Sequence, residues 1–273
     1  MNYTIGIIGN GFVGNALYEN FKIKFNTKVY DLLKDKSLNS LEETLASDVV
    51  FVCLPTPMNL SESCDCNLEI INNFFSEEIP KDCNSLFVIK STVPIGTTKK
   101  IKEIRADLKI VHNPEFLTAI NAKEDFANSY RNVIGGNKQD SEILLKIYEY
   151  MFPDAKNFLV TSNESETIKY FANTFLATKV SFFNIIYDVC EKYSLNYQNV
   201  INGICSDERI GYSHSSVPGP DGDRGFGGAC FPKDINALIN ILEKNNINNS
   251  MFKKVWEYNK MIRRNWDWQN YRK

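Results

Sequence analysis

The chain has 273 residues, enough for one large domain or two ordinary ones with a real hydrophobic core. Its composition, 43% hydrophobic and 23% charged, is that of an ordinary globular protein. A formal net charge of −2 gives no electrostatic basis for binding nucleic acid or an anionic membrane surface. No apolar run is long enough to cross a bilayer, so neither nucleic acid nor membrane is expected as a partner.

The cysteines and the first residues indicate a cellular compartment. The seven cysteines are odd in number and irregular in spacing. The first nine residues read as a strand entering a turn and not as an export signal. We therefore expect reduced thiols and a cytoplasmic location. Cys64 and Cys66 resemble half of a metal site, but the sequence has no second pair, so no metal is expected.

In the first half, short apolar runs alternate with amphipathic stretches. Strands are predicted at residues 3–8, 28–30, 48–54, 85–90, 110–112, 131–134 and 158–160. Helical patterns lie between them, for example at residues 15–25 and 141–151. This alternation predicts an α/β fold with a doubly wound, mostly parallel, Rossmann-like sheet.

The pattern changes near residue 161. A helical stretch without glycine or proline spans residues 164–193, and a loop rich in glycine, proline and aspartate follows at 211–228. Two more helical patterns cover residues 234–244 and 251–264. We therefore predict a Rossmann-like domain at residues 1–162 and a helical domain at 163–273, joined by the long helix.

A glycine pattern marks a nucleotide site. Gly9, Gly11 and Gly14 have the G-x-G-x-x-G spacing, and they follow a predicted strand and open a predicted helix. The first glycine permits the turn, the second admits a pyrophosphate, and the third lets helix and strand pack closely. Asp31 ends the second strand, where a carboxylate binds the ribose and repels the 2′-phosphate of NADP. The cofactor predicted is therefore NAD.

Lys169 and Asn173 are the first candidates for chemistry in the long helix. They are four residues apart and therefore share one face. Alone, the pair would be read as a surface lysine and a structural asparagine. The neighbours Phe171, Phe175 and Leu176 indicate a mostly buried helix, in which a lysine needs a reason.

Two short segments follow predicted strands. Thr92 lies in KSTVPIGTT and Glu115 lies in HNPEFL. Both positions are beyond strand carboxyl ends, where open α/β sheets bind ligands. Taken separately, Thr92 is more simply a turn residue, and Glu115 is more simply an acid at a helix start.

The segment GFGGACFPKD, residues 225–234, places Cys230 next to glycines, with Lys233 and Asp234 close behind. A free cysteine is often an inert small hydrophobic residue. A loop this rich in glycine offers little core to fill, so we favour a functional thiol.

Together, GNGFVG, LPTPM, KSTVPIGT, NPEFL, KYFAN and GFGGACFPKD resemble the UDP-glucose/GDP-mannose dehydrogenase family, up to about Arg264. That family oxidises the primary alcohol of a nucleotide sugar to a carboxylate with two NAD per sugar. The resemblance implies an NAD-dependent oxidoreductase that acts through a cysteine thiohemiacetal and thioester. UDP-glucose to UDP-glucuronate is the first reaction expected, in polysaccharide biosynthesis by family analogy.

The resemblance also implies roles for matching positions. Cys230 would be the nucleophile, Lys169 and Asn173 would stabilise the alkoxide and oxyanion, and Glu115 would be the base for thioester hydrolysis. Asp234 and Thr92 would hold a water that takes the first proton. The implied cofactor contacts are Gly9, Gly11, Phe12, Val13, Gly14, Asp31, Pro55, Thr56 and Thr92. The implied substrate contacts are Glu115, Phe116, Leu117, Lys169, Asn173, Arg209, Phe226, Gly227 and Lys233.

Some features depart from the family. The family normally continues into another α/β domain that grips the nucleotide, so we expect either a different grip or a different substrate. Ala119 stands where the family often has a glutamate.

Alternatives therefore stay open. They are a GDP-mannose or UDP-N-acetylhexosamine dehydrogenase, a one-step hydroxyacid dehydrogenase, against which Cys230 argues, and a non-catalytic NAD-binding scaffold. A homodimer formed through the helix at 164–193 is expected.

Overall fold

The computed structural model describes residues 2–59, 66–118 and 121–270. The chain forms two compact units. The sheet unit comprises Met1–Thr56 and Asn67–Lys169, and the helical unit comprises Pro57–Cys66 and Tyr170–Lys273. Among the described residues, no helix combines the length and apolar character that a membrane crossing requires.

The sheet unit is built on a seven-stranded sheet with the strand order β2-β1-β3-β4-β5-β6-β7. The neighbouring strands run parallel except β5 and β6, which pair antiparallel through His112 and Gly135. The predicted α/β fold with a mostly parallel sheet is therefore confirmed. The strands are β1 Thr4–Ile8, β2 Asn26–Tyr30, β3 Val49–Val52, β4 Leu86–Ile89, β5 Lys109–His112, β6 Arg131–Gly135 and β7 Lys156–Val160.

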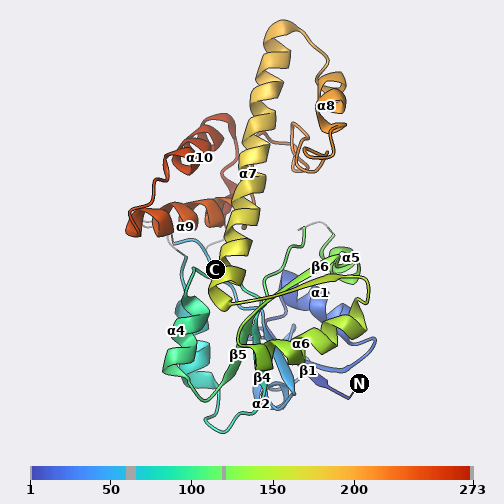
Figure 1. Ribbon diagram of the computed structural model, residues 1–273, viewed down its shortest axis with the longest axis vertical. Helices are drawn as coiled ribbons and strands as arrows, with labels where there is room; N and C mark the ends of the chain where they lie inside the picture. Colours follow the sequence, from blue (N-terminus) through green and yellow to red (C-terminus); the bar gives the residue numbers. More distant parts are fainter. Residues whose placement is uncertain (1, 60–65, 119–120, 271–273) are drawn as a thin grey trace. The chain divides into compact units, whose positions relative to one another are not determined.

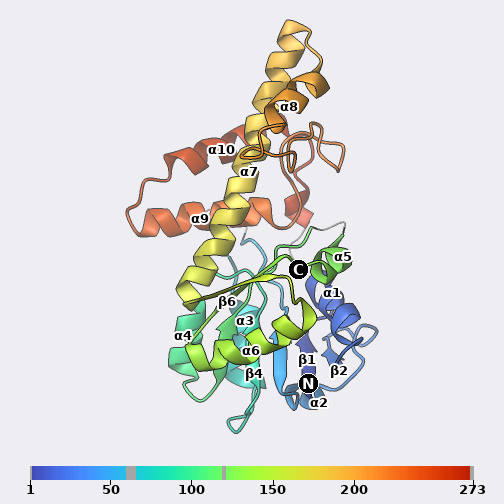
Figure 2. The same cartoon turned by 45° about the vertical axis from the view of Figure 1, so that its right-hand side comes forward.

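Helices cover both faces of the sheet, as Figures 1 and 2 show. One face packs against α1 (Phe12–Phe21), α5 (Ala122–Ala127) and α6 (Lys138–Met151). The other packs against α2 (Leu41–Leu45), α3 (Glu69–Asn73), the π-helix η1 (Phe74–Glu78) and α4 (Thr97–Ile104). The central strands are apolar along their whole length because both of their faces are buried, and β3 and β4 have no exposed residue.

The helical unit is organised around α7 (Ser162–Tyr193), whose residues up to Lys169 belong to the sheet unit. The other helices of the unit are α8 (Tyr197–Cys205), α9 (Phe231–Lys244), α10 (Ser250–Ile262) and the 3-10 helix η2 (Asp267–Asn270). Ala177 of α7 packs with Ile235 of α9 and Val255 of α10. Phe183 packs with Ile201 of α8, so the helices contact different parts of α7 (Figure 1).

One expectation about α7 is wrong. Phe171 and Phe175 are 43% and 66% exposed, whereas Lys169 is only 2% exposed. An apolar residue in a helix does not reveal which side the neighbouring elements cover. Here Phe175 is mostly uncovered, and Phe171 is covered only in part, with its ring against that of Phe252. Lys169 therefore does lie in the interior, but the phenylalanines were the wrong reason to expect it.

Candidate functional site

The turn after β1 is shaped by its glycines. Gly9 has φ of 91°, and a Cβ there would stand 2.7 Å from the carbonyl oxygen of Cys53. A Cβ on Gly14 would overlap the carbonyl oxygen of Gly9. A Cβ on Gly11, at the N-cap of α1, would meet nothing within 4 Å. The first and third glycines therefore shape the turn, and the second leaves room for a phosphate at a helix N-terminus.

Asp31 lies directly beside this turn. Its carboxylate accepts hydrogen bonds from the backbone N–H of Asn10 at 2.6 Å and of Leu33 at 2.9 Å. The sheet therefore brings the acid and the glycine turn together although 21 residues separate Asp31 from Asn10. A carboxylate in this place suits the ribose hydroxyls of an adenine dinucleotide, so the residues present fit NAD.

The remaining predicted cofactor contacts belong to the same unit. Phe12 is exposed and Val13 is half-buried at the start of α1, and Pro55 is exposed beyond β3. Thr56 donates from its hydroxyl to the carbonyl of Thr92 at 2.9 Å, which joins the segments that follow β3 and β4. These segments continue strands at their carboxyl ends, the edge at which open α/β sheets bind ligands.

Glu115 and Lys169 form a buried ion pair within the sheet unit. The ammonium of Lys169 lies 3.0 Å from Glu115 Oε1 and also donates to the Glu115 carbonyl at 2.5 Å. Their side chains are 9% and 3% exposed. Burial by itself would raise the pKa of Glu115, but Lys169, the Leu117 N–H and Lys90 together hold it below its ordinary value. The pair is therefore an ionised carboxylate held against a cation.

Phe116 and Leu117 frame this pair. The Lys169 ammonium lies 5.3 Å from the centre of the Phe116 ring, and the Leu117 N–H donates to Glu115 Oε2 at 2.7 Å. On the same ring lies the Arg131 guanidinium, 4.0 Å from its centre. Both carboxylate oxygens of Glu115 are thus engaged, which fixes the orientation of the side chain.

A second group of predicted site residues lies in the helical unit. Cys230 is exposed and is the N-cap residue of α9. Asp234, one turn further on, accepts from Lys233 at 2.6 Å and from Asn173 Nδ2 at 2.5 Å. Asp234 is 1% exposed, so this carboxylate is held by two donors in the interior. We call Cys230, Lys233, Asp234 and Asn173 the cysteine cluster.

The charges within the cysteine cluster support one another. Burial opposes the charge on Lys233, but the negative charge and hydrogen bond of Asp234, with Coulomb contributions from Cys66 and Cys230 as thiolates, outweigh it and raise the pKa of Lys233. The lysine is therefore a fixed cation one turn into α9. The helix start adds a partial positive charge at Cys230.

The glycine loop before Cys230 is held by the end of the chain. Asn259 Oδ1 accepts from the N–H of Phe226 at 2.7 Å, and its Nδ2 donates to the Phe226 carbonyl at 3.0 Å. Asp267 accepts from the N–H of Gly228 at 3.0 Å. A Cβ on Gly227 would overlap the Arg263 guanidinium, so a larger residue there would require Arg263 to move.

Two predicted substrate contacts, Arg209 and Phe226, do not take part in the cysteine cluster. Arg209 sits on an exposed turn, and within the described chain all its hydrogen bonds go to Asp207. The ring of Phe226 is 4% exposed and packs in the core with Ala177 and Ile235. Ala119 and Cys64 lie outside the described residues. Within them, no three His, Cys, Asp or Glu side chains gather as metal ligands would.

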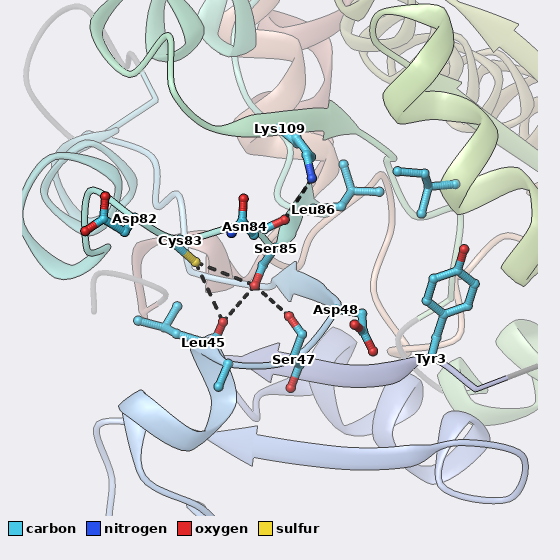
Figure 3. Close-up of a pocket in the computed structure, with 12 residues that line it drawn as sticks. Tyr3, Leu45, Ser47, Asp48, Asp82, Cys83, Asn84, Ser85, Leu86 and Lys109 are labelled. Carbon is cyan, nitrogen blue, oxygen red and sulfur yellow. Dashed lines mark hydrogen bonds between the residues drawn. The ribbon is translucent and has the colours of Figure 1, made fainter.

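A cavity lies at the opposite edge of the sheet. Figure 3 shows it at the amino ends of β1, β3, β4 and β5, with a volume of about 390 Å³. Its lining includes Asp48, Cys83 and Lys109, whose ammonium donates to the Asn84 carbonyl at 3.1 Å. None of the predicted site residues lines it, and ligands of such sheets bind at the carboxyl edge, so we do not assign the dinucleotide to this cavity.

The sequence patterns did not single out three residues that bond to the segments carrying the predicted site residues. Lys90 and Asn113 lie inside the quoted motifs, yet the motifs drew attention to Thr92 and Glu115. A lysine at the end of a wholly apolar strand is a signal that could have been used, because a buried lysine requires a partner. Asn259 gave no such signal, since its partner Phe226 is 33 residues away.

The fold and the glycine turn with its acid define a dinucleotide-binding protein with a Rossmann-like domain. Comparison with protein families makes this specific. The NAD binding domain of the UDP-glucose/GDP-mannose dehydrogenase family matches residues 24–152, and the central domain of that family matches residues 163–261. The chain belongs to the UDP-glucose/GDP-mannose dehydrogenase family.

Individual relatives agree. A UDP-glucose 6-dehydrogenase of Rickettsia typhi is 35% identical over 302 residues, covering 96% of this chain and 67% of the relative. The UDP-glucose 6-dehydrogenase of Rickettsia prowazekii is 40% identical over 78% of this chain and 49% of the relative. A UDP-glucose dehydrogenase structure from Pyrobaculum islandicum superposes with a TM-score of 0.84 at 26% identity, covering 96% of this chain and 68% of that one. The chain thus spans about half to two thirds of the length of these relatives.

Proposed function

We propose that this chain catalyses the NAD-dependent, four-electron oxidation of a nucleotide sugar, with UDP-glucose to UDP-glucuronate as the first candidate. The observation that carries the proposal is the cysteine cluster. It presents the exposed thiol of Cys230 at a helix N-terminus. One turn away lie the Lys233 ammonium and the Asp234 carboxylate, which accepts two hydrogen bonds. A thiol so placed suits covalent catalysis, which the second oxidation of an alcohol requires.

In the proposed reaction, NAD when bound supplies the hydride acceptor for two successive oxidations. The first removes a hydride and a proton from the primary alcohol and leaves an aldehyde. The Cys230 thiolate adds to the aldehyde carbon, and the oxygen becomes an oxyanion that takes a proton or a hydrogen bond. Loss of the second hydride from this thiohemiacetal, together with any proton that its oxygen has taken up, leaves a thioester. Water then cleaves the C–S bond, giving the carboxylate and the free thiol.

Each group is proposed for the step that its chemistry suits. Lys169, an ammonium held in the interior, stabilises the alkoxide and the oxyanion. Asn173 donates a hydrogen bond, and Asp234 with Thr92 holds the water that takes the first proton. Glu115 is ionised because its pKa is lowered, so it can accept a proton from the hydrolytic water.

The experiment is the yield of NADH per mole of limiting UDP-glucose, for the wild type beside Cys230→Ala. Cys83→Ala is the matched control, because Cys83 lines the cavity at the opposite edge of the sheet. We expect two NADH and one uronate from the wild type and the control, and no uronate from Cys230→Ala. Two NADH from Cys230→Ala would refute the thioester route.

Other yields separate the alternatives. One NADH per substrate from the wild type would favour a one-step hydroxyacid dehydrogenase. Turnover with GDP-mannose or a UDP-N-acetylhexosamine in place of UDP-glucose would change the substrate assigned. Binding of NAD without turnover of any of these would favour the non-catalytic scaffold.

We propose further that the chain forms a homodimer through α7. An exposed apolar stripe runs along this helix at spacings of three, four and seven residues, which places its members on one face. Its members are Phe171, Phe175, Phe182, Ile185, Val189 and Tyr193. An antiparallel or parallel copy of the same stripe would cover it. Light scattering at micromolar concentration should give twice the mass of the chain, and Phe182→Glu should give the single mass.

We propose a cytoplasmic location because the proposed reaction requires a reduced Cys230 thiol. The thiol of Cys230 is exposed and must stay reduced to act as a nucleophile. Fractionation of cells that express the full-length protein should recover it with cytoplasmic markers, and recovery with an oxidising compartment would contradict the proposal.

A further inference from the structure

We propose that Lys90 is a positioning residue for this reaction: it anchors Asn113 and supplies the positive charge that the Glu115–Lys169 pair by itself lacks. The inference rests on the function proposed above and deepens it. It assigns a task to a buried lysine that the proposed steps leave unused.

The first argument is geometric. Lys90 follows β4 directly and is 3% exposed. Its ammonium donates to Asn113 Oδ1 at 2.8 Å, and the same oxygen accepts from the hydroxyl of Tyr148 at 2.5 Å. Asn113 Nδ2 donates to the carbonyl of Val133 at 2.7 Å. These three bonds fix Asn113, which stands two residues before Glu115 with a proline between them.

Lys90 and Glu115 also border one small cavity. Its volume is about 40 Å³, room for roughly three water molecules at about 10–15 Å³ each. Among the described residues, no carboxylate lies within ion-pair distance of the Lys90 ammonium, which instead faces an amide oxygen. Arg131 and Asp125 also line the cavity, and they carry opposite charges. Lys90 is thus a buried cation without a counter-ion of its own.

Three other titratable side chains nearby, Cys53, Tyr148 and His112, are uncharged at neutral pH. Burial raises the pKa of Cys53 to about 12 and also raises the pKa of Tyr148 above its ordinary value. Burial lowers the pKa of His112 to about 3. The buried charges are therefore Lys90 and Lys169 against Glu115, which sum to one positive charge while Lys90 is protonated.

This sum matters for the proposed chemistry. Lys169 is paired with Glu115 at 3.0 Å, and an ion pair exerts a much weaker field than a lone cation. An alkoxide that forms beside Lys169 would be stabilised by the surplus charge of Lys90, which is fixed in place before the reaction. Burial lowers the pKa of Lys90 to about 8, so this surplus is present at neutral pH and is lost as the pH rises through that value.

Two variants separate charge from anchoring. Lys90→Gln keeps an N–H donor for Asn113 without the charge, and Lys90→Met removes both. Lys109→Met is the control, because Lys109 bonds Asn84 at the other edge of the sheet. With saturating NAD and substrate, we expect kcat at pH 7 to fall about tenfold or more in both Lys90 variants. The decline of the wild type above pH 8 should vanish in both, and Lys109→Met should match the wild type.

A wild-type profile in Lys90→Gln would overturn the inference, since the hydrogen bond alone would then suffice. A second readout needs no turnover. The folded pKa of Lys90 lies below its unfolded value of 10.5, so the folded state favours the neutral lysine. The stability contributed by Lys90 should therefore rise between about pH 8 and pH 10.5 in the wild type, and this rise should be absent in both variants.

The two readouts can fail separately. If the wild type forms no NADH from any candidate sugar, the proposed function fails, and the pH dependence of the melting temperature still decides whether Lys90 is the buried charge that the inference requires. A rise that is lost in both variants supports a buried charged Lys90. A rise of equal size in the wild type and both variants overturns it.

Discussion

Replacing Lys169 by methionine should destabilise the protein strongly. Methionine matches the length of lysine but leaves the Glu115 carboxylate, 9% exposed, without its nearest cation. Removing one partner of a buried ion pair costs about 3–5 kcal/mol, a large share of the roughly 5–15 kcal/mol that folding provides. At about 2–4 °C for each kcal/mol, the melting temperature should fall by roughly 10 °C.

The pH dependence of stability should also reverse its sign. In the wild type the pKa of Glu115 is lowered, so its contribution is present above the unfolded value of 4.5 and is lost as the pH falls through the folded value. In Lys169→Met, burial is no longer offset by this cation, and the folded pKa should rise above 4.5. Stability contributed by Glu115 should then decrease as the pH rises from 4 to 8.

The assay is thermal unfolding from pH 4 to pH 8, with two comparisons. Glu115→Gln in the Lys169→Met background should recover part of the loss, because a neutral amide is less costly to bury than a carboxylate. Lys138→Met, which breaks the exposed pair with Glu142, should change little. A loss below about 1 kcal/mol in Lys169→Met, with the pH dependence of the wild type, would refute the buried pair.

Three further predictions concern other parts of the chain. Gly11→Ala should fold normally but weaken NAD binding in titration calorimetry. Gly14→Ala should weaken NAD binding and also lower the melting temperature, because a methyl group at Gly14 would overlap the backbone and one at Gly11 would not. Equal effects of the two variants would contradict the different roles of the two glycines. Glu166→Ala should cost at least about 1 kcal/mol in denaturant unfolding, since this carboxylate accepts three hydrogen bonds at the start of α4; an unchanged midpoint would disprove it. Asn259→Ala should lower the melting temperature and change the rate at which iodoacetamide alkylates Cys230. The control Asn245→Ala, which changes an exposed residue at a helix end, should change neither. An alkylation rate in Asn259→Ala equal to that of the wild type would show that Asn259 does not order the glycine loop before Cys230.

The sequence was sufficient for the parts that depend on local order. The alternation of apolar runs and helical patterns predicts the sheet, because buried parallel strands must be apolar on both faces. The glycine turn and Asp31 are equally local, since each glycine answers a backbone requirement of its own turn. Helix starts were less certain: α9 begins at Phe231 and not at Asp234, because Pro232 is favourable in a first helical turn.

The tertiary structure decided which side chains are buried and which of them pair. The exposed Phe175 and the buried Lys169 lie on the same helix, and periodicity does not tell which face the rest of the fold covers. The pairing of Glu115 with Lys169 spans 54 residues, and that of Asn173 with Asp234 spans 61. The charge state of Lys90 depends on burial and on neighbours from three other segments. Such long-range contacts arise only when the chain has packed, because desolvation and Coulomb energies depend on position in space and not on order in the sequence.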